Sequence, residues 1–285
     1  MSGNNPAGKI LVLGASGHVG RPLVKALLAK GEAVKAASRG GQPIEGAEGV
    51  AFEFGKPETF AAAFAGVDRV LVMLPGGYVN SKELLTPVIE AAAARKVKVV
   101  LQTAFGVDAD DSIPYRQVEL ALIGAGVPYV ILRPNWFTDN FLNFWKPGID
   151  HAGVLAVPAG DGKSSFVDAR DIAASAASAL TSDRFDGQAF NLTGPQALGY
   201  GEAAEILSGV IGRKVGYTPI DDETFVGILT GAGVGEDYAR FLAFIFHPVR
   251  EGWTAGVTDA VETLTGHAPI SVARWAQDNA AALRA

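Results

Sequence analysis

The stretch that decides the fold is Leu11-Val-Leu-Gly-Ala-Ser-Gly-His-Val-Gly20, in a chain of 285 residues. It indicates a buried strand that runs into a helix through the spacing Gly14-x-x-Gly17-x-x-Gly20. Gly14 permits a tight turn, Gly17 lets the backbone approach a pyrophosphate, and Gly20 lets the helix lie close to the strand. Free N–H groups at the start of a helix attract phosphate. We therefore predict that a dinucleotide binds here, with contacts from Gly14, Ser16, Gly17, His18, Val19 and Gly20.

Around this turn, short apolar runs alternate with helical patterns as far as Arg133. Helices are predicted over Val19–Lys30, with a proline in its first turn and a glycine after its end, and over Ser81–Arg95. Most predicted strands are apolar throughout, which is typical of strands covered on both faces. These strands are Lys9–Leu13, Ala33–Ser38, Val50–Phe54, Arg69–Leu74, Val97–Thr103 and Tyr129–Arg133. Repeated strand–helix–strand units predict an α/β fold with a doubly wound parallel Rossmann sheet.

The pattern changes after Arg133, where an aromatic-rich stretch begins. We predict a dinucleotide-binding Rossmann domain over residues 1–150 and a smaller, mostly helical, substrate-binding lobe over residues 151–285. The lobe is expected to pack on the first domain, with the chain returning to the sheet. The features that indicate this are the aromatic stretch Asn135–Trp145, the segment Ser165–Asp168 with a helix ending at Leu180, the strand Gln188–Leu192, the helix Gly201–Ile211 and the helical pattern of Asp221–Ala285.

Composition excludes several classes of protein. Apolar residues make up 48% of the chain and charged residues 19%, as in a folded globular protein. No apolar run approaches the ~20 residues that a membrane span needs, and the N-terminus lacks the pattern of a signal peptide. The absence of cysteine removes disulfides and thiolate catalysis. We expect a cytoplasmic protein that does not act at a membrane.

The net charge and the positions of the histidines indicate whether nucleic acid or a metal ion binds. The formal net charge is -6 and no basic run occurs, which argues against nucleic-acid binding. His151, His247 and His267 are scattered without metal-ligand spacing, so no metal site is predicted. Nothing in the sequence sets the oligomeric state, and a homodimer stays an open alternative.

The end of the second strand indicates which dinucleotide binds. An NAD site usually has Asp or Glu there to hold the ribose 2′-hydroxyl. This strand instead ends in Ala36-Ala-Ser-Arg-Gly40, without an acid. A guanidinium cannot accept a hydrogen bond but pairs well with phosphate. We predict NADP(H) as the cofactor, with Ser38 and Arg39 at the adenosine phosphate; the alternative is a solvated Arg39 at the strand end.

The chain lacks a proton-donating dyad in its usual place. Short-chain dehydrogenases usually carry Tyr-x-x-x-Lys on the helix after the fifth strand, where the Lys lowers the pKa of the Tyr phenol. That helix has Tyr115, but Glu119 occupies the Lys position, and a nearby carboxylate acts on a phenol in the opposite direction. Tyr78 and Lys82 match the spacing but follow the fourth strand. Tyr115, Thr103 and the pair Tyr78 and Lys82 are therefore alternative catalytic candidates.

Aromatic residues indicate the kind of substrate. Trp136 and Phe137 follow the sixth strand at its carboxyl end, where open α/β sheets bind ligands. Such side chains supply a flat apolar wall for an aromatic acceptor, although core packing is the alternative for any one of them. The predicted substrate contacts are Tyr115, Asn135, Trp136, Phe137, Phe141, Phe241 and Phe244.

Four segments carry a family resemblance over nearly the whole chain: Gly14–Gly20, Arg133–Asn140, Ser165–Ala173 and Asn191–Pro195. They resemble the NmrA-like branch of atypical short-chain dehydrogenases, which includes quinone, triphenylmethane and festuclavine oxidoreductases. The resemblance implies that Leu74, Pro75 and Gly76 line the path from adenosine to nicotinamide, and that Thr103, Ala104 and Pro134 lie near the nicotinamide. It places Phe54 at the adenine, where the family often has Asp nearby. Members commonly have His where this chain has Tyr115.

These observations lead to one main hypothesis and two alternatives. The main hypothesis is an NADPH-dependent oxidoreductase that delivers hydride to a quinone or a related conjugated aromatic acceptor, because such acceptors need little help from a protein acid. The first alternative is a redox-sensing regulator that binds NADP(H) without turnover. The second is an NADPH-dependent carbonyl or imine reductase that uses a proton donor of the protein.

Overall fold

The computed structural model describes residues 8–285, which form two compact units. The first unit contains residues 8–134 and Arg170–Asn191, and the second contains Asn135–Ala169 and Leu192–Ala285. Each unit is thus made of two separate segments of the chain. The chain first passes from the first unit to the second at Asn135, whereas the sequence placed this boundary near residue 150. The earlier boundary arises because aromatic side chains that follow Asn135 belong to the core of the second unit.

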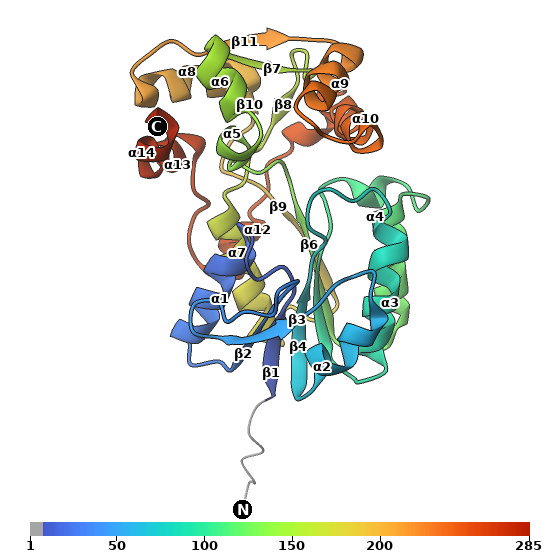
Figure 1. Cartoon of the computed structure of the whole chain (residues 1–285). Coiled ribbons are helices and arrows are strands. Elements are labelled where there is room, and N and C mark those ends of the chain that lie inside the picture. Colours follow the sequence, from blue (N-terminus) through green and yellow to red (C-terminus); the bar gives the residue numbers. More distant parts are fainter. Residues whose placement is uncertain (1–7) are drawn as a thin grey trace, which may run out of the picture. The chain divides into compact units, whose positions relative to one another are not determined.

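The first unit is built on a seven-stranded sheet in the order β3-β2-β1-β4-β5-β6-β9 (Figure 1). Neighbouring strands from β3 to β6 are parallel, which confirms the doubly wound α/β prediction. The strands are β1 Lys9–Val12, β2 Val34–Ser38, β3 Glu48–Ala51, β4 Val67–Val72, β5 Lys98–Gln102, β6 Tyr129–Pro134 and β9 Gln188–Leu192. The strand order reverses between β1 and β4, so a crevice for a ligand is expected at their carboxyl ends.

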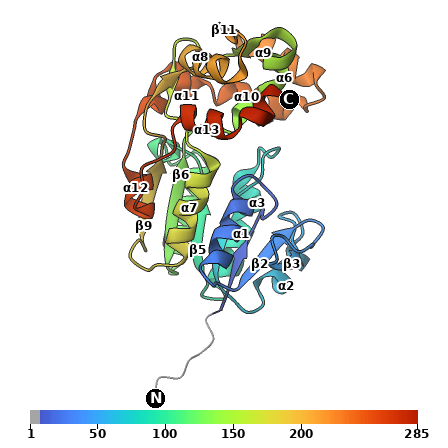
Figure 2. The ribbon, with the colours of Figure 1, turned by 90° about the vertical axis from the view of Figure 1, so that its left-hand side faces the viewer.

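Helices cover both faces of this sheet. The helices α1 and α7 lie on one face, and α3 and α4 lie on the other (Figures 1 and 2). On the second face, Leu85 and Ile89 of α3 and Leu122 of α4 are fully or almost fully buried in one apolar core with residues of β1, β4, β5 and β6. The bounds are α1 Gly20–Ala29, α2 Phe60–Phe64, α3 Ser81–Ala93, α4 Pro114–Gly124 and α7 Ala169–Leu180, with short 3-10 turns at Pro57–Thr59 and Val107–Ala109.

One predicted strand lies two to three residues away from its observed position. The segment Val50–Phe54 was expected to be a strand, whereas β3 ends at Ala51. Phe52 and Phe54 leave the sheet edge and are buried, and the ring of Phe52 stacks on Phe60 with centroids 5.1 Å apart. Burial of these rings outweighs a longer pairing at the edge of the sheet.

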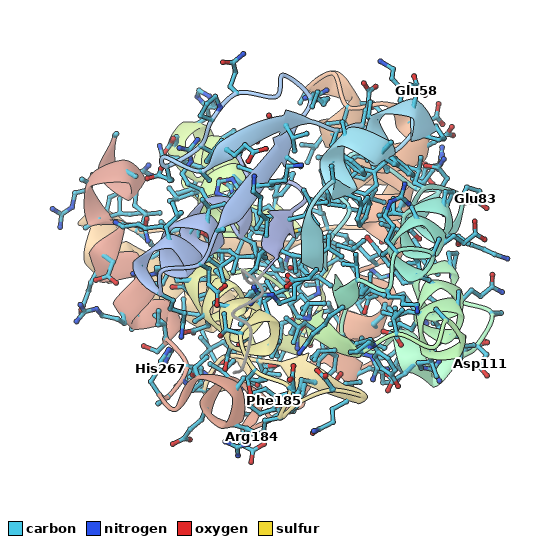
Figure 3. All side chains as sticks on the ribbon, turned by 90° about the horizontal axis from the view of Figure 1, so that it is seen from below. Glu58, Glu83, Asp111, Arg184, Phe185 and His267 are labelled. Atoms are coloured by element: carbon cyan, nitrogen blue, oxygen red, sulfur yellow. The ribbon has the colours of Figure 1, made fainter. Side chains whose placement is uncertain are left out.

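The returning segment of the first unit is held to the sheet by Lys98. This buried ammonium at the start of β5 donates to the carbonyl oxygen of Ser182 at 2.7 Å and pairs with Asp186. Next to it, the guanidinium of Arg184 lies 5.2 Å from the ring centroid of Phe185, on the side shown in Figure 3. A buried charge that is paired and hydrogen-bonded in this way fixes where the returning segment lies.

The second unit has a core rich in aromatic residues, including Phe141, Phe166, Tyr200, Phe246 and Trp275. It contains the small sheets β10-β8 and β11-β7. Its elements are α5 Asn140–Asn143, α6 Lys146–Ala152, β7 Val154–Val157, β8 Lys163–Ser164, β10 Leu198–Gly199, α8 Tyr200–Ile211, β11 Gly216–Pro219, α9 Asp222–Gly231, α10 Glu236–Phe244, α11 His247–Arg250, a 3-10 turn at Trp253–Ala255, α12 Ala260–Thr265, α13 Val272–Asp278 and α14 Ala280–Arg284. Between residues 8 and 285, no helix is long and apolar enough to cross a membrane.

Candidate functional site

The glycine turn between β1 and α1 has the geometry of a phosphate cradle. Gly14 has a φ of 70°, and the N–H of Gly17 donates to the carbonyl oxygen of Gly14 at 3.0 Å. A Cβ atom on Gly20 would lie 2.2 Å from that same oxygen, so only glycine fits there. The first turn of α1 holds no acidic residue that would repel a phosphate. Ser16 and His18 are exposed at this turn, and these features fit the pyrophosphate of a dinucleotide.

The end of β2 offers a cation for a second phosphate. Ser38 is the last residue of β2, and its hydroxyl oxygen accepts a hydrogen bond from the N–H of Gly41 at 3.1 Å. Arg39 follows in the loop and is exposed, and its guanidinium has no ion pair with any residue from 8 to 285. An unpaired guanidinium at this edge fits the 2′-phosphate of NADP(H).

The remaining predicted cofactor contacts follow other strands of the same sheet. Leu74, Pro75 and Gly76 lie in the loop after β4, one residue beyond its end; Leu74 is half-buried and the next two are exposed. Thr103 and the half-buried Ala104 come after β5. Further positions are Pro134, the buried last residue of β6, Val19 at 3% exposure and Phe54 at 8% exposure. All of these residues lie in the first unit. Phe54 lies beyond the edge strand β3, and each of the others lies at or just after the carboxyl end of a strand near the reversal of strand order.

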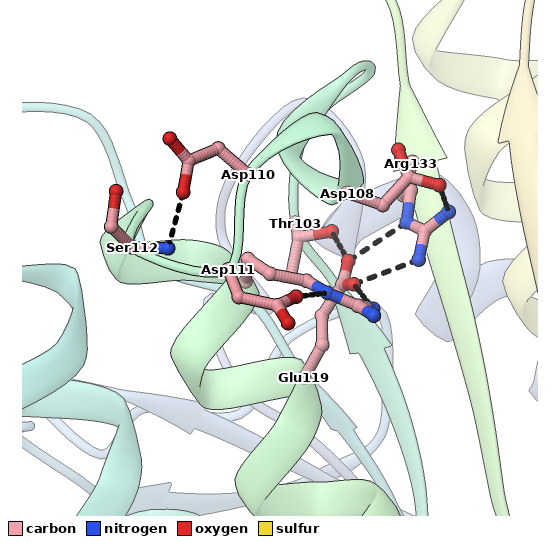
Figure 4. Close-up of polar contacts among 8 residues, drawn as sticks. Thr103, Asp108, Asp110, Asp111, Ser112, Glu119 and Arg133 are labelled. Carbon is pink, nitrogen blue, oxygen red and sulfur yellow. Dashed lines mark hydrogen bonds and ion pairs between the residues drawn. The ribbon is translucent and has the colours of Figure 1, made fainter.

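A buried polar cluster lies between the ends of β5 and β6 and helix α4 (Figure 4). Glu119 has no exposed surface. Its Oε1 accepts from Thr103 Oγ1 at 2.7 Å and from Arg133 Nε at 2.9 Å. Its Oε2 accepts from Arg133 Nη2 at 2.8 Å and from Arg116 Nη1 at 3.0 Å. Both oxygens of the carboxylate are therefore fully used.

The cluster continues to the surface through its arginines. Arg133 also pairs with Asp108, and Arg116 pairs with Asp111 at 2.9 Å. Asp111 lies at the outer surface of the unit (Figure 3). Burial on its own would raise the pKa of Glu119, but hydrogen bonds from Arg133, Thr103 and Arg116 outweigh burial and hold that pKa below its ordinary value. Glu119 is thus an ionised carboxylate.

The sequence pointed to Glu119 only as the residue that stands in place of a lysine. Its structural partner Arg133 was missed as a partner, although a signal was present. Glu119 lies on the same stripe of α4 as the buried Leu122, and Arg133 interrupts the apolar run of β6. Two opposite charges on buried faces of neighbouring elements are stable only when paired.

The alternative proton donors differ in their surroundings. Tyr115 lies in the first turn of α4 and packs partly buried against the core of the first unit. Tyr78 lies in the loop before α3 and is 39% exposed, whereas Lys82 is in the first turn of α3. Tyr78 and Lys82 therefore do not lie one turn apart on a helix, as the dyad of short-chain dehydrogenases does.

Two of the predicted substrate contacts, Asn135 and Phe141, are buried within the second unit and contact its other residues. Asn135 is 3% exposed, and its Nδ2 donates to Ser165 Oγ at 2.7 Å and to the carbonyl oxygen of Thr254 at 2.8 Å. The Asn135 Oδ1 accepts from the N–H of Trp136 at 2.8 Å. Phe141 has no exposed surface, because Trp145, Phe166 and Trp275 surround its ring. Phe141 is a core residue and Asn135 a structural one.

The other predicted aromatic contacts retain some exposed surface. Trp136, Phe137 and Phe241 are half-buried, and Phe244 is 67% exposed. Trp136 packs on Phe246 with ring centroids 4.5 Å apart. These four side chains keep the apolar surface that contact with an aromatic molecule requires.

Comparison with known proteins identifies the family of this chain. Residues 14–183 match a family described as NAD(P)H-binding. The NAD(P)H azoreductase of Xenophilus azovorans is 32% identical over 97% of this chain and 99% of its own. Quinone oxidoreductase 2 of Escherichia coli is 25% identical over 93% of this chain and 96% of its own.

A solved structure extends this agreement to the fold. Citrobacter sp. triphenylmethane reductase, complexed with NADP(H), superposes with a TM-score of 0.82 at 27% identity, over 95% of this chain and 100% of that chain. The match of 14–183 with the NAD(P)H-binding family agrees with the resemblance to the NmrA-like branch. The chain belongs to the NAD(P)H-binding family and is an NAD(P)H-dependent oxidoreductase.

Proposed function

We propose that the protein uses NADPH to reduce a quinone or a related conjugated aromatic acceptor. The observation that carries this proposal is the hydrogen bonding of Glu119, which stands where a dehydrogenase dyad has its lysine. Both of its carboxylate oxygens accept hydrogen bonds from Thr103, Arg116 and Arg133. No lysine one turn beyond Tyr115 promotes proton transfer from its hydroxyl. A quinone suits this site, because hydride transfer to it leaves a delocalised anion that water can protonate. A cationic conjugated dye also suits it, because hydride transfer makes the dye neutral and no proton is needed.

Each group of residues has a distinct part in this proposal. The glycine turn and Arg39 hold the phosphates of the cofactor, which supplies the hydride when bound. Leu74, Pro75 and Gly76 guide it across the strand ends. Ala104 and Pro134 shape the space beside the nicotinamide, and Tyr115 shapes the place of the acceptor. Trp136, Phe137, Phe241 and Phe244 are proposed as aromatic contacts of the substrate.

Names of relatives support the class of acceptor. One is called an azoreductase, another a quinone oxidoreductase, and a third a triphenylmethane reductase. Azo compounds, quinones and triphenylmethane dyes share an extended conjugated system that accepts hydride. This common property favours a conjugated acceptor for the present chain over a simple aldehyde or ketone.

A panel of acceptors tests the proposal. Purified protein is mixed with NADPH and with quinones, azo dyes, triphenylmethane dyes, imines or aldehydes, and the absorbance of the reduced nicotinamide is followed. We expect turnover with quinones or dyes and little with aldehydes. Tight NADPH binding without any turnover would instead favour the redox sensor. Fast reduction of aldehydes or imines would favour a reductase with a proton donor of its own.

A further inference from the structure

The hydroxyl of Thr103 lies at the edge of the sheet where a ligand is expected. Thr103 follows the last residue of β5, and its N–H donates to the carbonyl oxygen of Leu132 on β6 at 2.9 Å. Thr103 is 6% exposed, and its Oγ1 lies 2.7 Å from Glu119 Oε1. Carboxyl ends of parallel strands near a reversal of strand order form the ligand crevice of open α/β sheets.

The direction of the hydrogen bond between Thr103 and Glu119 follows from the surroundings of Glu119. Arg133 and Arg116 direct three N–H groups at this carboxylate. An ionised carboxylate has no hydrogen to give and can only accept. Thr103 has a single hydroxyl hydrogen, so that hydrogen is the one in the 2.7 Å bond.

The oxygen of Thr103 is left with its acceptor capacity. Among residues 8–285, no group donates a hydrogen bond to this oxygen. A hydroxyl that has given its hydrogen away keeps two lone pairs and can meet a ligand only through them. Thr103 is therefore unable to protonate a ligand, since Glu119 holds its hydrogen and has none with which to replace it.

We propose that Glu119 is a positioning residue that makes Thr103 a hydrogen-bond acceptor for the bound ligand. The ligand group that meets Thr103 then carries an N–H or O–H donor. Two sources have this chemistry: the carboxamide of the nicotinamide and the hydroxyl of a reduced acceptor such as a hydroquinone. The second source rests on the proposed function, whereas the first requires only that the cofactor binds.

Pairs of ligands that differ in one donor test this inference. The first pair is NADPH and its 3-acetylpyridine analogue, in which a methyl group replaces the carboxamide NH2. The second pair is a hydroquinone and its methyl ether, bound to the protein loaded with NADP+. Dissociation constants for all four are measured by calorimetry on the wild type, Thr103→Val and Thr103→Ser.

The expected result is a change in the preference for the donor-bearing ligand. In one of the two pairs, wild type and Thr103→Ser should bind the donor-bearing ligand about three- to tenfold more tightly than its partner. This is the range for a neutral hydrogen bond. Thr103→Val, which has nearly the same shape but no oxygen, should bind both members equally. The pair that responds identifies the source of the donor. A folded Thr103→Val that keeps the wild-type preference in both pairs overturns the proposal; Thr103→Ala serves if the Val variant does not fold.

The role of Glu119 has a test of its own. In Glu119→Gln, an amide group can donate to Thr103 Oγ1, so the preference should fall or reverse. Glu119→Asp is the second variant, because it keeps the charge for Arg133 and withdraws the carboxylate from Thr103. A folded variant of either kind that keeps the wild-type preference contradicts the positioning role. These binding measurements need no turnover, so their failure is distinguishable from failure of the proposed function.

Discussion

Arg133 on β6 and Glu119 on α4 meet through two parallel hydrogen bonds, from Nε to Oε1 at 2.9 Å and from Nη2 to Oε2 at 2.8 Å. A bidentate pair of this kind fixes both side chains in one plane. It therefore connects the last strand before the second unit to the helix that carries Tyr115.

Removing one charge of this pair should destabilise the protein. We expect Glu119→Gln to lower the free energy of unfolding by about 3–5 kcal/mol, because the buried carboxylate that Arg133 and Arg116 share loses its charge, and only Asp108 and Asp111 nearer the surface remain to pair with them. Urea unfolding followed by circular dichroism measures the change. Glu90→Gln on the exposed side of α3 is the control, and we expect it to change stability by less than about 0.5 kcal/mol. A similar small loss in both variants would contradict the structural importance of the pair.

Stability should also depend on pH through Glu119. Its pKa in the folded protein lies below the ordinary value of 4.5, so the unfolded chain binds more protons between the two values. The contribution is fully present above pH 4.5 and is lost as the pH falls towards the folded pKa. Urea titrations from neutral to acidic pH should show this decline in the wild type. The decline should be shallower in Glu119→Gln, and parallel curves for the two proteins would show that other carboxylates dominate.

Arg39 should decide the choice of cofactor. We expect Arg39→Ala to weaken NADPH binding by about ten- to a hundredfold, which corresponds to losing a charge-assisted contact. Binding of NADH should change little, since it has no 2′-phosphate. Fluorescence titration of both cofactors measures the change, with Lys25→Ala as a control for the loss of an exposed positive charge. Equal NADPH affinity in the wild type and Arg39→Ala would refute this role of Arg39.

A single methyl group in the glycine turn should abolish cofactor binding. In Gly20→Ala the new Cβ meets the Gly14 carbonyl oxygen at 2.2 Å, so the turn must open or the helix must move. Gly124→Ala is the matched control, because nothing lies within 4 Å of a Cβ there. We expect the control to bind NADPH like the wild type and to be slightly more stable. Normal NADPH affinity in a folded Gly20→Ala would show that the turn does not hold the phosphates.

Tyr115 should shape the site without acting as an obligatory acid. Tyr115→Phe removes only the hydroxyl, and we expect it to keep at least about a tenth of kcat with a good quinone, the scale of one neutral hydrogen bond. General acid catalysis contributes about 10²- to 10⁴-fold. A thousandfold fall in kcat with unchanged NADPH affinity would make Tyr115 the proton donor and favour the carbonyl reductase alternative.

Most of the first unit could be predicted because its signals are local. The glycine turn, the apolar strands and the helix ends are each set by neighbouring residues, and β9 was predicted with the bounds Gln188–Leu192 that it has. The bounds of β3 were less predictable. That edge strand pairs with one neighbour, and the burial of Phe52 and Phe54 decides where it ends.

The candidate site was predictable only in its cofactor half. The roles of Arg133 and Asn135 depend on partners that are distant in sequence, such as Glu119 and Thr254. An aromatic stretch also does not reveal which of its rings turns inward. Phe141 is fully enclosed, whereas Phe137 keeps exposed surface, because helix α5 directs one side chain into the core.

The division of each unit between two chain segments constrains how the protein folds during synthesis and where its gene can be truncated. During synthesis the sheet stays unfinished until Leu192 has left the ribosome, since β9 forms one edge and Lys98 pairs with Asp186. The ribosome has by then already released Asn135–Ala169, which must wait for the residues after Leu192 before its own core can close. If the gene is divided after β6, the N-terminal product therefore has a sheet that lacks β9. The C-terminal product has the residues of the second unit together with a segment of the first unit that has no sheet to join. Neither product is therefore expected to be a minimal enzyme.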